Sequence, residues 1–301
     1  GTVEPLKVFR EKLIGMDPRD IEAVNAVMNR AVAYAGTAKA AVDIACHDIL
    51  GKDSGLALYK LLGGLSNTIE TDMTVGIDAP EIMAAHAKEH IKAGFRVIKT
   101  KVGTDITEDL ARVKAIREAV GDDVKIRLDA NQGWNAREAV ELLKRLNEYD
   151  IELVEQPVRR FDFEGLKYVT ANSPVPVMAD ESCWDSRDAL HLVSERAVDF
   201  INIKLMKCGG LWEAKKIVNI AEAAGVEIML GCMAEESGIA INAAAALGAA
   251  LGNITRADLD ASFSLKKLPY EGGFTIENTK DLVLSEAPGL GLSRLKEEMF
   301  Q

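Results

Sequence analysis

Charged side chains recur at nearly regular intervals through the centre of the chain, each at the end of a short run of β-branched and aliphatic residues. Starting at Lys101, the successive spacings between one such charged residue and the next are 28, 26, 25 and 24 residues. A strand, a helix and their connections take up about this length, so successive βα units would bring one charged group each to the same edge of a parallel sheet. The series consists of Lys99, Lys101, Asp129, Glu155, Asp180 and Lys204, and the pair Asp258 and Asp260 follows near the last predicted strand.

Three carboxylates on neighbouring strands would repel one another strongly unless a cation neutralised them. Asp129, Glu155 and Asp180 offer only oxygen donors, so Mg²⁺ suits the set better than zinc, and Mn²⁺ is also possible. We therefore predict a divalent metal site. The alternative is that each carboxylate caps the following helix or pairs with a lysine.

Two lysines lie together on one predicted strand and a third lies three strands away. Lys99 and Lys101 are two residues apart, so both side chains point to the same face. At about 6–7 Å, two ammonium groups repel by roughly 2 kcal/mol, which would lower one lysine pKa by more than one unit. Lys101 would then be a base tuned by Lys99, with Lys204 opposite it across the metal. Such a pair suits a 1,1-proton transfer; the alternative is structural ion pairing.

The acidic pair near the end of the series also shares one face of its predicted strand. Asp258 and Asp260 are two residues apart, and if both face the same edge they create a cation site beyond the metal. The alternative is that they cap a loop or meet Arg256.

The elements that must position these groups alternate regularly. Eight strand-like runs are separated by seven helical stretches, which predicts a (β/α)8-type barrel whose active site lies at the carboxyl ends of the strands. Residues 1 to about 66 have helical periodicity instead, and the tail beyond residue 261 is rich in loops. The predicted strands are 71–77, 96–102, 124–130, 151–155, 175–179, 200–205, 226–231 and 254–259.

Composition excludes several classes of protein. With 36 basic and 47 acidic residues the formal net charge is −11, which disfavours binding to nucleic acid or to an anionic membrane. We find no apolar run of membrane-spanning length and no signal peptide. The four cysteines form no CxxC pair, so we expect reduced thiols and a cytoplasmic protein.

Taken together, Lys99-Thr-Lys101, Asp129-Ala-Asn131, Glu155-Gln-Pro157, Asp180-Glu-Ser182 and Asn202-Ile-Lys204 resemble the muconate-lactonizing subgroup of the enolase superfamily. The resemblance implies a (β/α)7β barrel with an α+β capping domain. It also implies that Asp129, Glu155 and Asp180 bind Mg²⁺ and that Lys101 and Lys204 are the acid–base pair around an enediolate.

The run from residue 253 to 260 resembles the DxD element of that subgroup's dipeptide epimerases, such as the L-Ala-D/L-Glu epimerases. In these enzymes the two aspartates hold the α-ammonium of the dipeptide, which N-acyl amino acids and succinylbenzoates lack. Family members begin with capping-domain strands and a mobile loop, whereas this sequence begins with Gly1 among the capping helices. We expect either that a tag or cleavage scar precedes this segment or that part of the natural amino terminus is absent.

Several further residues are weaker candidates. The loop after the seventh strand, with Cys232, Met233 and Glu235, could hold the substrate backbone, or it could be a plain loop. Arg159 and Arg160 could meet an acidic substrate side chain, but exposed arginines are usually only solvated. By their place beside the motifs, Asn131, Gln156 and Asn202 are predicted to orient the carboxylates and lysines.

One motif match is set aside. His86-Ala-Lys-Glu89-His90 fits H-x-x-E-H, a zinc-protease pattern. It lies within a predicted barrel helix, far from the strand ends, so we do not expect zinc there.

The sequence therefore predicts a Mg²⁺-dependent dipeptide epimerase that acts at the α-carbon beside the carboxylate. The nearest alternatives are N-acylamino acid racemisation, o-succinylbenzoate synthesis and cycloisomerisation; a non-catalytic barrel that binds a small acid is more remote. The predicted domains are capping helices at 1–66, a barrel at 67–265 and a returning segment at 266–301. A homo-oligomer is expected by analogy with enzymes of this type.

Overall fold

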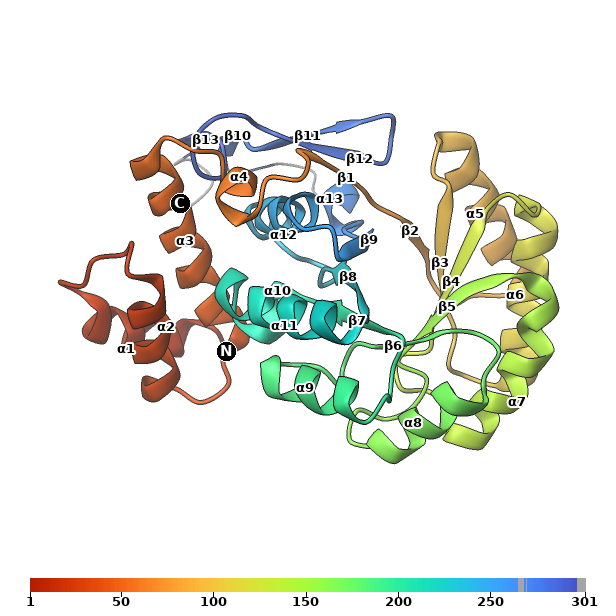
Figure 1. The fold of residues 1–301 in the computed structure, drawn as a ribbon. Coiled ribbons are helices and arrows are strands. Elements are labelled where there is room, and N and C mark those ends of the chain that lie inside the picture. Colours follow the sequence, from red (N-terminus) through yellow and green to blue (C-terminus); the bar gives the residue numbers. More distant parts are fainter. Residues whose placement is uncertain (265–267, 269, 297–301) are drawn as a thin grey trace.

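A sheet of eight parallel strands forms the centre of the protein (Figure 1), whose computed structural model describes residues 1–264, 268 and 270–296. The strands follow one another in the sheet in the order of the sequence, as a barrel requires. They are β2 (Met73–Val75), β3 (Val97–Lys101), β4 (Lys125–Asp129), β5 (Ile151–Glu155), β6 (Val177–Ala179), β7 (Phe200–Ile203), β8 (Glu227–Gly231) and β9 (Ile254–Asp258). Each overlaps the strand predicted from the sequence.

The first and last strands lie next to each other, so the sheet is nearly closed. The Asp72 N–H, just before β2, donates to the Ala257 carbonyl of β9 at 3.1 Å. The Leu259 N–H donates to Thr71 Oγ1 at 2.8 Å. The predicted barrel is confirmed.

Seven longer helices connect the strands and cover the sheet. Capping residues set their beginnings: Asn135 and Glu138, for example, form a reciprocal capping box at the start of α7. Gly94 and Gly225 end α5 and α11 in the left-handed region, at φ +117° and +73°. The helices are α5 (Pro80–Ala93), α6 (Ile106–Val120), α7 (Ala136–Leu146), α8 (Phe163–Asn172), α9 (Ser186–Ser194), α11 (Leu211–Ala224) and α12 (Gly238–Ala250), with short turns α10 (Leu205–Cys208) and η1 (Asn147–Tyr149).

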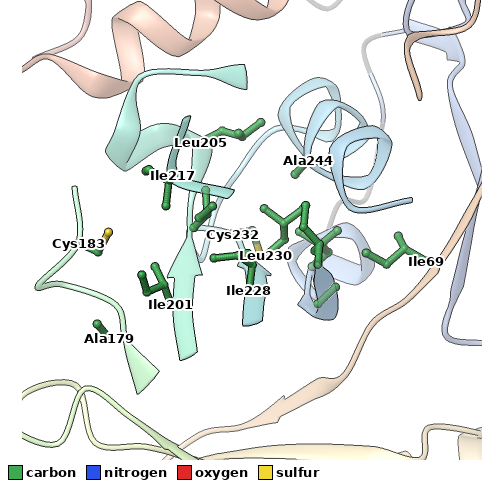
Figure 2. Packing of buried hydrophobic residues seen from close by; sticks show 14 of the residues in the cluster. Ile69, Ala179, Cys183, Ile201, Leu205, Ile217, Ile228, Leu230, Cys232 and Ala244 are labelled. Carbon is green, nitrogen blue, oxygen red and sulfur yellow. The ribbon is translucent and has the colours of Figure 1, made fainter. Parts of the chain in front are cut away.

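Alternation along each strand separates an apolar outer face from a polar inner one. Figure 2 shows Ile201 and Ile228 of neighbouring strands packed with Ile217 of α11 and Ala244 of α12, all in one buried cluster. The alternate positions point into the barrel. A small apolar cluster of Leu153, Met178 and Met229 fills part of this interior, and buried charged side chains fill much of the rest.

The amino-terminal helices pack beside the barrel and are tied to it by a buried aspartate. They are α1 (Val3–Leu13), α2 (Ile21–Ala31), α3 (Gly36–Ser54) and α4 (Leu58–Leu62). Asp43 of α3 is completely buried and accepts the Leu211 N–H at 2.6 Å, so it caps α11 across a large sequence separation. Asn25 of α2 donates to the other Asp43 oxygen at 2.8 Å. The two parts of the chain therefore share hydrogen bonds as well as apolar contacts.

The tail contains more strand than the sequence suggested. β12 (Asp281–Leu284) pairs with β1 (Thr68–Glu70) and β11 (Phe274–Glu277), and β10 (Tyr270–Gly272) pairs with β13 (Leu292–Leu295). A four-residue helix, α13 (Ala261–Ser264), follows β9. The Leu58 N–H donates to the Gly289 carbonyl at 2.7 Å, so the tail returns to the helical region. The predicted boundary at 265/266 lies outside the described residues.

No helix in the described ranges is both long enough and apolar enough to cross a membrane.

Candidate active site at the barrel mouth

Lys99 lies inside the barrel and joins three carboxylates. Its Nζ is 2.6 Å from Asp258, 2.7 Å from Glu155 and 3.0 Å from Asp129. Burial opposes its charge, but these carboxylates outweigh the burial and raise the pKa of Lys99 well above its usual value. Lys99 is therefore an ammonium whose charge is balanced by carboxylates from other strands. The base predicted from the sequence is Lys101, and its tuning by Lys99 stays a prediction.

Lys101 stands one step nearer the mouth and is more accessible. Its Nζ donates to Asp129 Oδ2 at 2.6 Å and to Asn131 Oδ1 at 2.9 Å, and its side chain is 30% exposed. Asn131 Nδ2 in turn donates to Glu181 at 3.2 Å. Burial disfavours the charge of Asp129, but Lys99 and Lys101 outweigh that cost and lower its pKa. Lys101 is therefore held at the mouth by a carboxylate and an amide.

Across the mouth, Lys204 follows β7 directly and donates to Asp180 Oδ2 at 2.8 Å. A second lysine, which sequence reasoning missed, lies beneath it. Lys207 of α10 is 6% exposed and donates to Asp180 Oδ1 at 2.5 Å and to the Asn202 carbonyl at 3.0 Å. Both lysines offset the burial of Asp180 and hold its pKa far below its usual range. Despite burial, Asp180 and Glu155 raise the pKa of Lys204.

Glu155 lies in the row between the other two carboxylates. It pairs in register with Asp129 of β4, and Asn202 Nδ2 donates to its Oε1 at 2.6 Å. Burial, followed by the neighbouring Asp129 charge, raises the pKa of Glu155 to about 7. Both burial and a neighbouring negative charge disfavour the ionised carboxylate.

The residues present fit a hard divalent cation. Asp129, Glu155 and Asp180 are at most 2% exposed, contribute only oxygen atoms, and lie at the ends of three adjacent strands. Glu155 Oε2 lies 2.7 Å from the Lys99 ammonium, and Glu155 Oε1 accepts from Asn202. No group of three metal-binding side chains is found in the described ranges, where Asp129 and Asp180 each accept a hydrogen bond from a lysine.

Backbone strain accompanies the site. Asn131, two residues after β4, and Gln156, directly after β5, both have φ of +39°, in the left-handed region that non-glycine residues rarely adopt. Gln156 is fully buried, and its Oε1 accepts the N–H groups of Asp180 and Ser182 at 2.9 and 3.0 Å. The predicted role of Gln156 is to orient the carboxylates, and its hydrogen bonds go to the backbone of Asp180 and Ser182.

The acidic pair divides between interior and mouth. Asp258 is 5% exposed and bound to Lys99, whereas Asp260 is half-buried and accepts the Thr74 N–H at 3.1 Å. Burial, then the Asp258 charge, raises the pKa of Asp260. Arg256 points elsewhere, to Glu152 and Glu227. Arg256 therefore does not form the ion pair with Asp258 or Asp260 that was the alternative explanation for these two acids.

The weaker candidates are spread around the same rim. Cys232 is buried, with Sγ 3.8 Å from Asp260, while Met233 and Glu235 are exposed. The next residue, Glu236, is the buried glutamate: it accepts the Met233 N–H at 2.8 Å, and burial raises its pKa to about 7. Two adjacent glutamates in a loop gave no sequence signal for which one would turn inward.

Arg160 and the two histidines of the H-x-x-E-H motif are the remaining candidates from the sequence. Arg160 is exposed, with its guanidinium 4.5 Å from the Phe161 ring centroid and 5.5 Å from that of Trp184. His86 and His90 lie on α5, where no metal-binding cluster forms among the described residues.

A cavity of about 1040 Å³ lies between α2, the start of α3 and the loops after β5, β6 and β7, and includes Glu181 and Lys207 in its wall.

Fold and site together define a class: a parallel (β/α) barrel whose strand ends carry lysines and buried carboxylates. Residues 82–298 match the family described as enolase C-terminal domain-like. Residues 6–63 match the mandelate racemase / muconate lactonizing enzyme N-terminal domain. The chain belongs to this family of the enolase superfamily, as its motifs predicted.

Named relatives cover nearly all of the chain. A hydrophobic dipeptide epimerase of Enterococcus faecalis is 56% identical over 97% of this chain and 83% of its own length. A crystal structure of a dipeptide epimerase from Enterococcus faecalis, complexed with Mg and the dipeptide L-Leu-L-Tyr, is 56% identical and has a TM-score of 0.95. The match covers 98% of this chain and 83% of that one. The L-Ala-D/L-Glu epimerase of Bacillus subtilis is 44% identical over 95% of this chain and 78% of its own. An N-succinyl-L-Arg/Lys racemase of Bacillus cereus is 36% identical over 96% of this chain and 78% of its own length.

Proposed function

We propose that this protein is a Mg²⁺-dependent dipeptide epimerase. The observation that carries the proposal is the placement of Lys101 and Lys204 on opposite sides of three buried carboxylates at one barrel mouth, with an acidic pair on the last strand. The 56% identity to an epimerase of hydrophobic dipeptides supports a dipeptide with apolar side chains as substrate.

In this proposal Asp129, Glu155 and Asp180 would hold Mg²⁺. The cation would supply positive charge to offset the negative charge that develops on the substrate carboxylate as the α-proton leaves. Asn202 and Gln156 would keep the Glu155 side chain and the Asp180 backbone in place through the hydrogen bonds described above.

Lys101 and Lys204 would carry the proton transfer. For one direction of the reaction, the neutral amine of Lys101 removes the α-proton and becomes an ammonium. The ammonium of Lys204 then gives its proton to the opposite face of the same carbon, so configuration inverts and the net proton count is unchanged. The reverse reaction exchanges the two roles.

Asp258 and Asp260 would bind the ammonium group at the other end of the dipeptide. Asp260 is the more accessible of the two, and Asp258 holds Lys99 in the interior. Cys232, Met233 and Glu235 would line the adjoining rim. An N-acylated substrate has no ammonium for this pair, which favours a dipeptide over the N-succinyl amino acids named for the Bacillus cereus relative.

The test is replacement of the acidic pair. Asp258→Asn with Asp260→Asn should raise KM for a hydrophobic dipeptide at least tenfold. The matched control is Asp122→Asn with Asp123→Asn, which changes charge equally at exposed positions before β4. Unchanged dipeptide turnover in the test variant, or faster turnover of N-succinyl amino acids by the wild type, would favour the racemase alternative.

Mn²⁺ should support the same reaction, because it takes similar oxygen ligands.

We further propose that the protein forms a homo-oligomer in the cytoplasm. All four cysteines are free thiols, which suits a reducing compartment. Mass photometry of the purified protein would test the oligomer, and a single peak at about the monomer mass of 32.6 kDa would contradict it.

A further inference from the structure

Beneath the mouth, two buried cations are each shared among several acids. Lys99 lies within 3.0 Å of Asp258, Glu155 and Asp129, and Arg127 binds both Asp72 and Glu152. Transfer of unpaired charge into such an interior is costly, and proteins commonly reduce the cost by protonating a carboxylate.

Asp72, a neighbour of Asp258, has no role in the proposed chemistry. It precedes β2, and its N–H donates to Ala257, so it lies beside Asp258 at the point where the barrel closes. Its Oδ2 accepts from Arg127 Nη1 at 2.8 Å. Asp258 Oδ2 correspondingly accepts from Lys99 at 2.6 Å. Each carboxyl group thus has one oxygen bound to a cation.

The second oxygen of each carboxyl group lacks a donor. Asp72 Oδ1 and Asp258 Oδ1 are both buried, and no N–H or O–H from the described residues reaches either one. Asp72 lies within hydrogen-bonding reach of Asp258. A proton on one of the two carboxyl groups would let it donate a hydrogen bond to the other and would remove one negative charge from the pair.

We infer that Asp72 is protonated at neutral pH and donates a hydrogen bond to Asp258, which makes Asp72 a positioning residue for the proposed ammonium site. The inference rests on the proposed function only for that positioning role. With Lys99 on one oxygen and Asp72 on the other, the Asp258 carboxylate cannot rotate freely.

The charged groups around Asp72 agree with this location of the proton. Burial, followed by the Asp258 charge, raises the pKa of Asp72 well above its usual value despite Arg127 and Lys99; Asp260 adds to the shift. The pKa of Asp258 is lowered instead, because Lys99 outweighs its burial and Asp72 donates to it. The Glu152 carboxylate, on β5, lies 2.6 Å from Arg127 Nε. It therefore offsets part of the arginine charge and weakens the attraction between Arg127 and an ionised Asp72.

Infrared spectroscopy of the full chain at pH 7 tests the proton directly. ¹³C-labelled aspartate separates aspartic from glutamic acids, which matters because Glu155 and Glu236 have pKa values of about 7. We expect a protonated aspartic carbonyl band that shifts with the label and disappears in Asp72→Asn. The absence of any such band would overturn the inference.

Kinetics test the positioning role. An amide at residue 72 can donate the same hydrogen bond, so Asp72→Asn should keep KM for the dipeptide within about twofold, whereas Asp72→Ala should raise it about tenfold with a smaller change in kcat. If Asp72→Asn is as impaired as Asp72→Ala, the residue acts through negative charge and the inference is wrong. An unchanged KM in Asp72→Ala would overturn the positioning role.

The spectrum and the kinetics separate this inference from the proposed function. A wild-type protein that turns over no dipeptide would refute the proposed function and the positioning role with it. The carboxyl band would still report the proton on Asp72, because that reading needs neither substrate nor metal.

Discussion

Gly231→Ala should disable the site by steric displacement alone. Gly231 ends β8, and a Cβ there would lie 2.6 Å from Asn202 Oδ1 and 3.0 Å from Lys204 Cε. Ordinary contacts begin at about 3.4 Å, so Asn202 must retreat by about 3.4 − 2.6 = 0.8 Å and Lys204 by about 3.4 − 3.0 = 0.4 Å. Asn202 would then loosen its 2.6 Å hydrogen bond to Glu155.

The expected consequence is a loss in kcat of about 10- to 100-fold, because a misplacement near 1 Å can cost about 100-fold. The assay is epimerisation of a hydrophobic dipeptide at saturating Mg²⁺. Gly252→Ala is the matched control: Gly252 is exposed before β9, and its added Cβ would meet only Leu65 at an ordinary 3.6 Å. If Gly231→Ala works at the wild-type rate while folding normally, the placement of Lys204 and Asn202 argued above is wrong.

Three further predictions concern stability and reactivity. Asp43→Ala should lower the free energy of unfolding by about 2–3 kcal/mol in urea titration, because it uncaps α11 and leaves buried N–H groups without an acceptor; a change below about 0.5 kcal/mol would contradict this. Burial opposes ionisation of Glu152, but its arginine partners lower its pKa, so its contribution to stability is present above pH 4.5 and lost as the pH falls further. Glu152→Gln should therefore flatten the acid limb of the stability curve, and an unchanged slope would refute the assignment. Burial raises the thiol pKa values of Cys46 and Cys208 to about 11 and 12, so iodoacetamide at pH 7.5 should label the native thiols about 100-fold more slowly than the unfolded ones, a difference that peptide mass spectrometry would detect.

Local patterns were enough to predict the barrel and the residues at its mouth. The charged residues recur once per βα unit, and two-residue spacing places Lys99 with Lys101 and Asp258 with Asp260 on shared faces. The parity that places Asp129 inside the barrel also places Arg127 there, so the buried arginine could have been found by the same reasoning.

Long-range electrostatics could not be predicted in the same way. The charge state of Lys99 depends on carboxylates from β4, β5 and β9, whose distances only the folded barrel sets. Lys207 has the sequence signature of an ordinary helix lysine, yet it binds Asp180. Which of Glu235 and Glu236 turns inward depends on the path of one loop.

The central claim is that two lysines exchange the α-proton of a dipeptide. The most direct measurement is incubation with Mg²⁺ and hydrophobic dipeptides in D₂O, followed by mass spectrometry and chiral analysis. Wild type should incorporate one deuteron and interconvert the epimers, while Lys101→Ala and Lys204→Ala should each stop interconversion. Lack of deuterium uptake by any dipeptide, or wild-type epimerisation by both variants, would contradict the account.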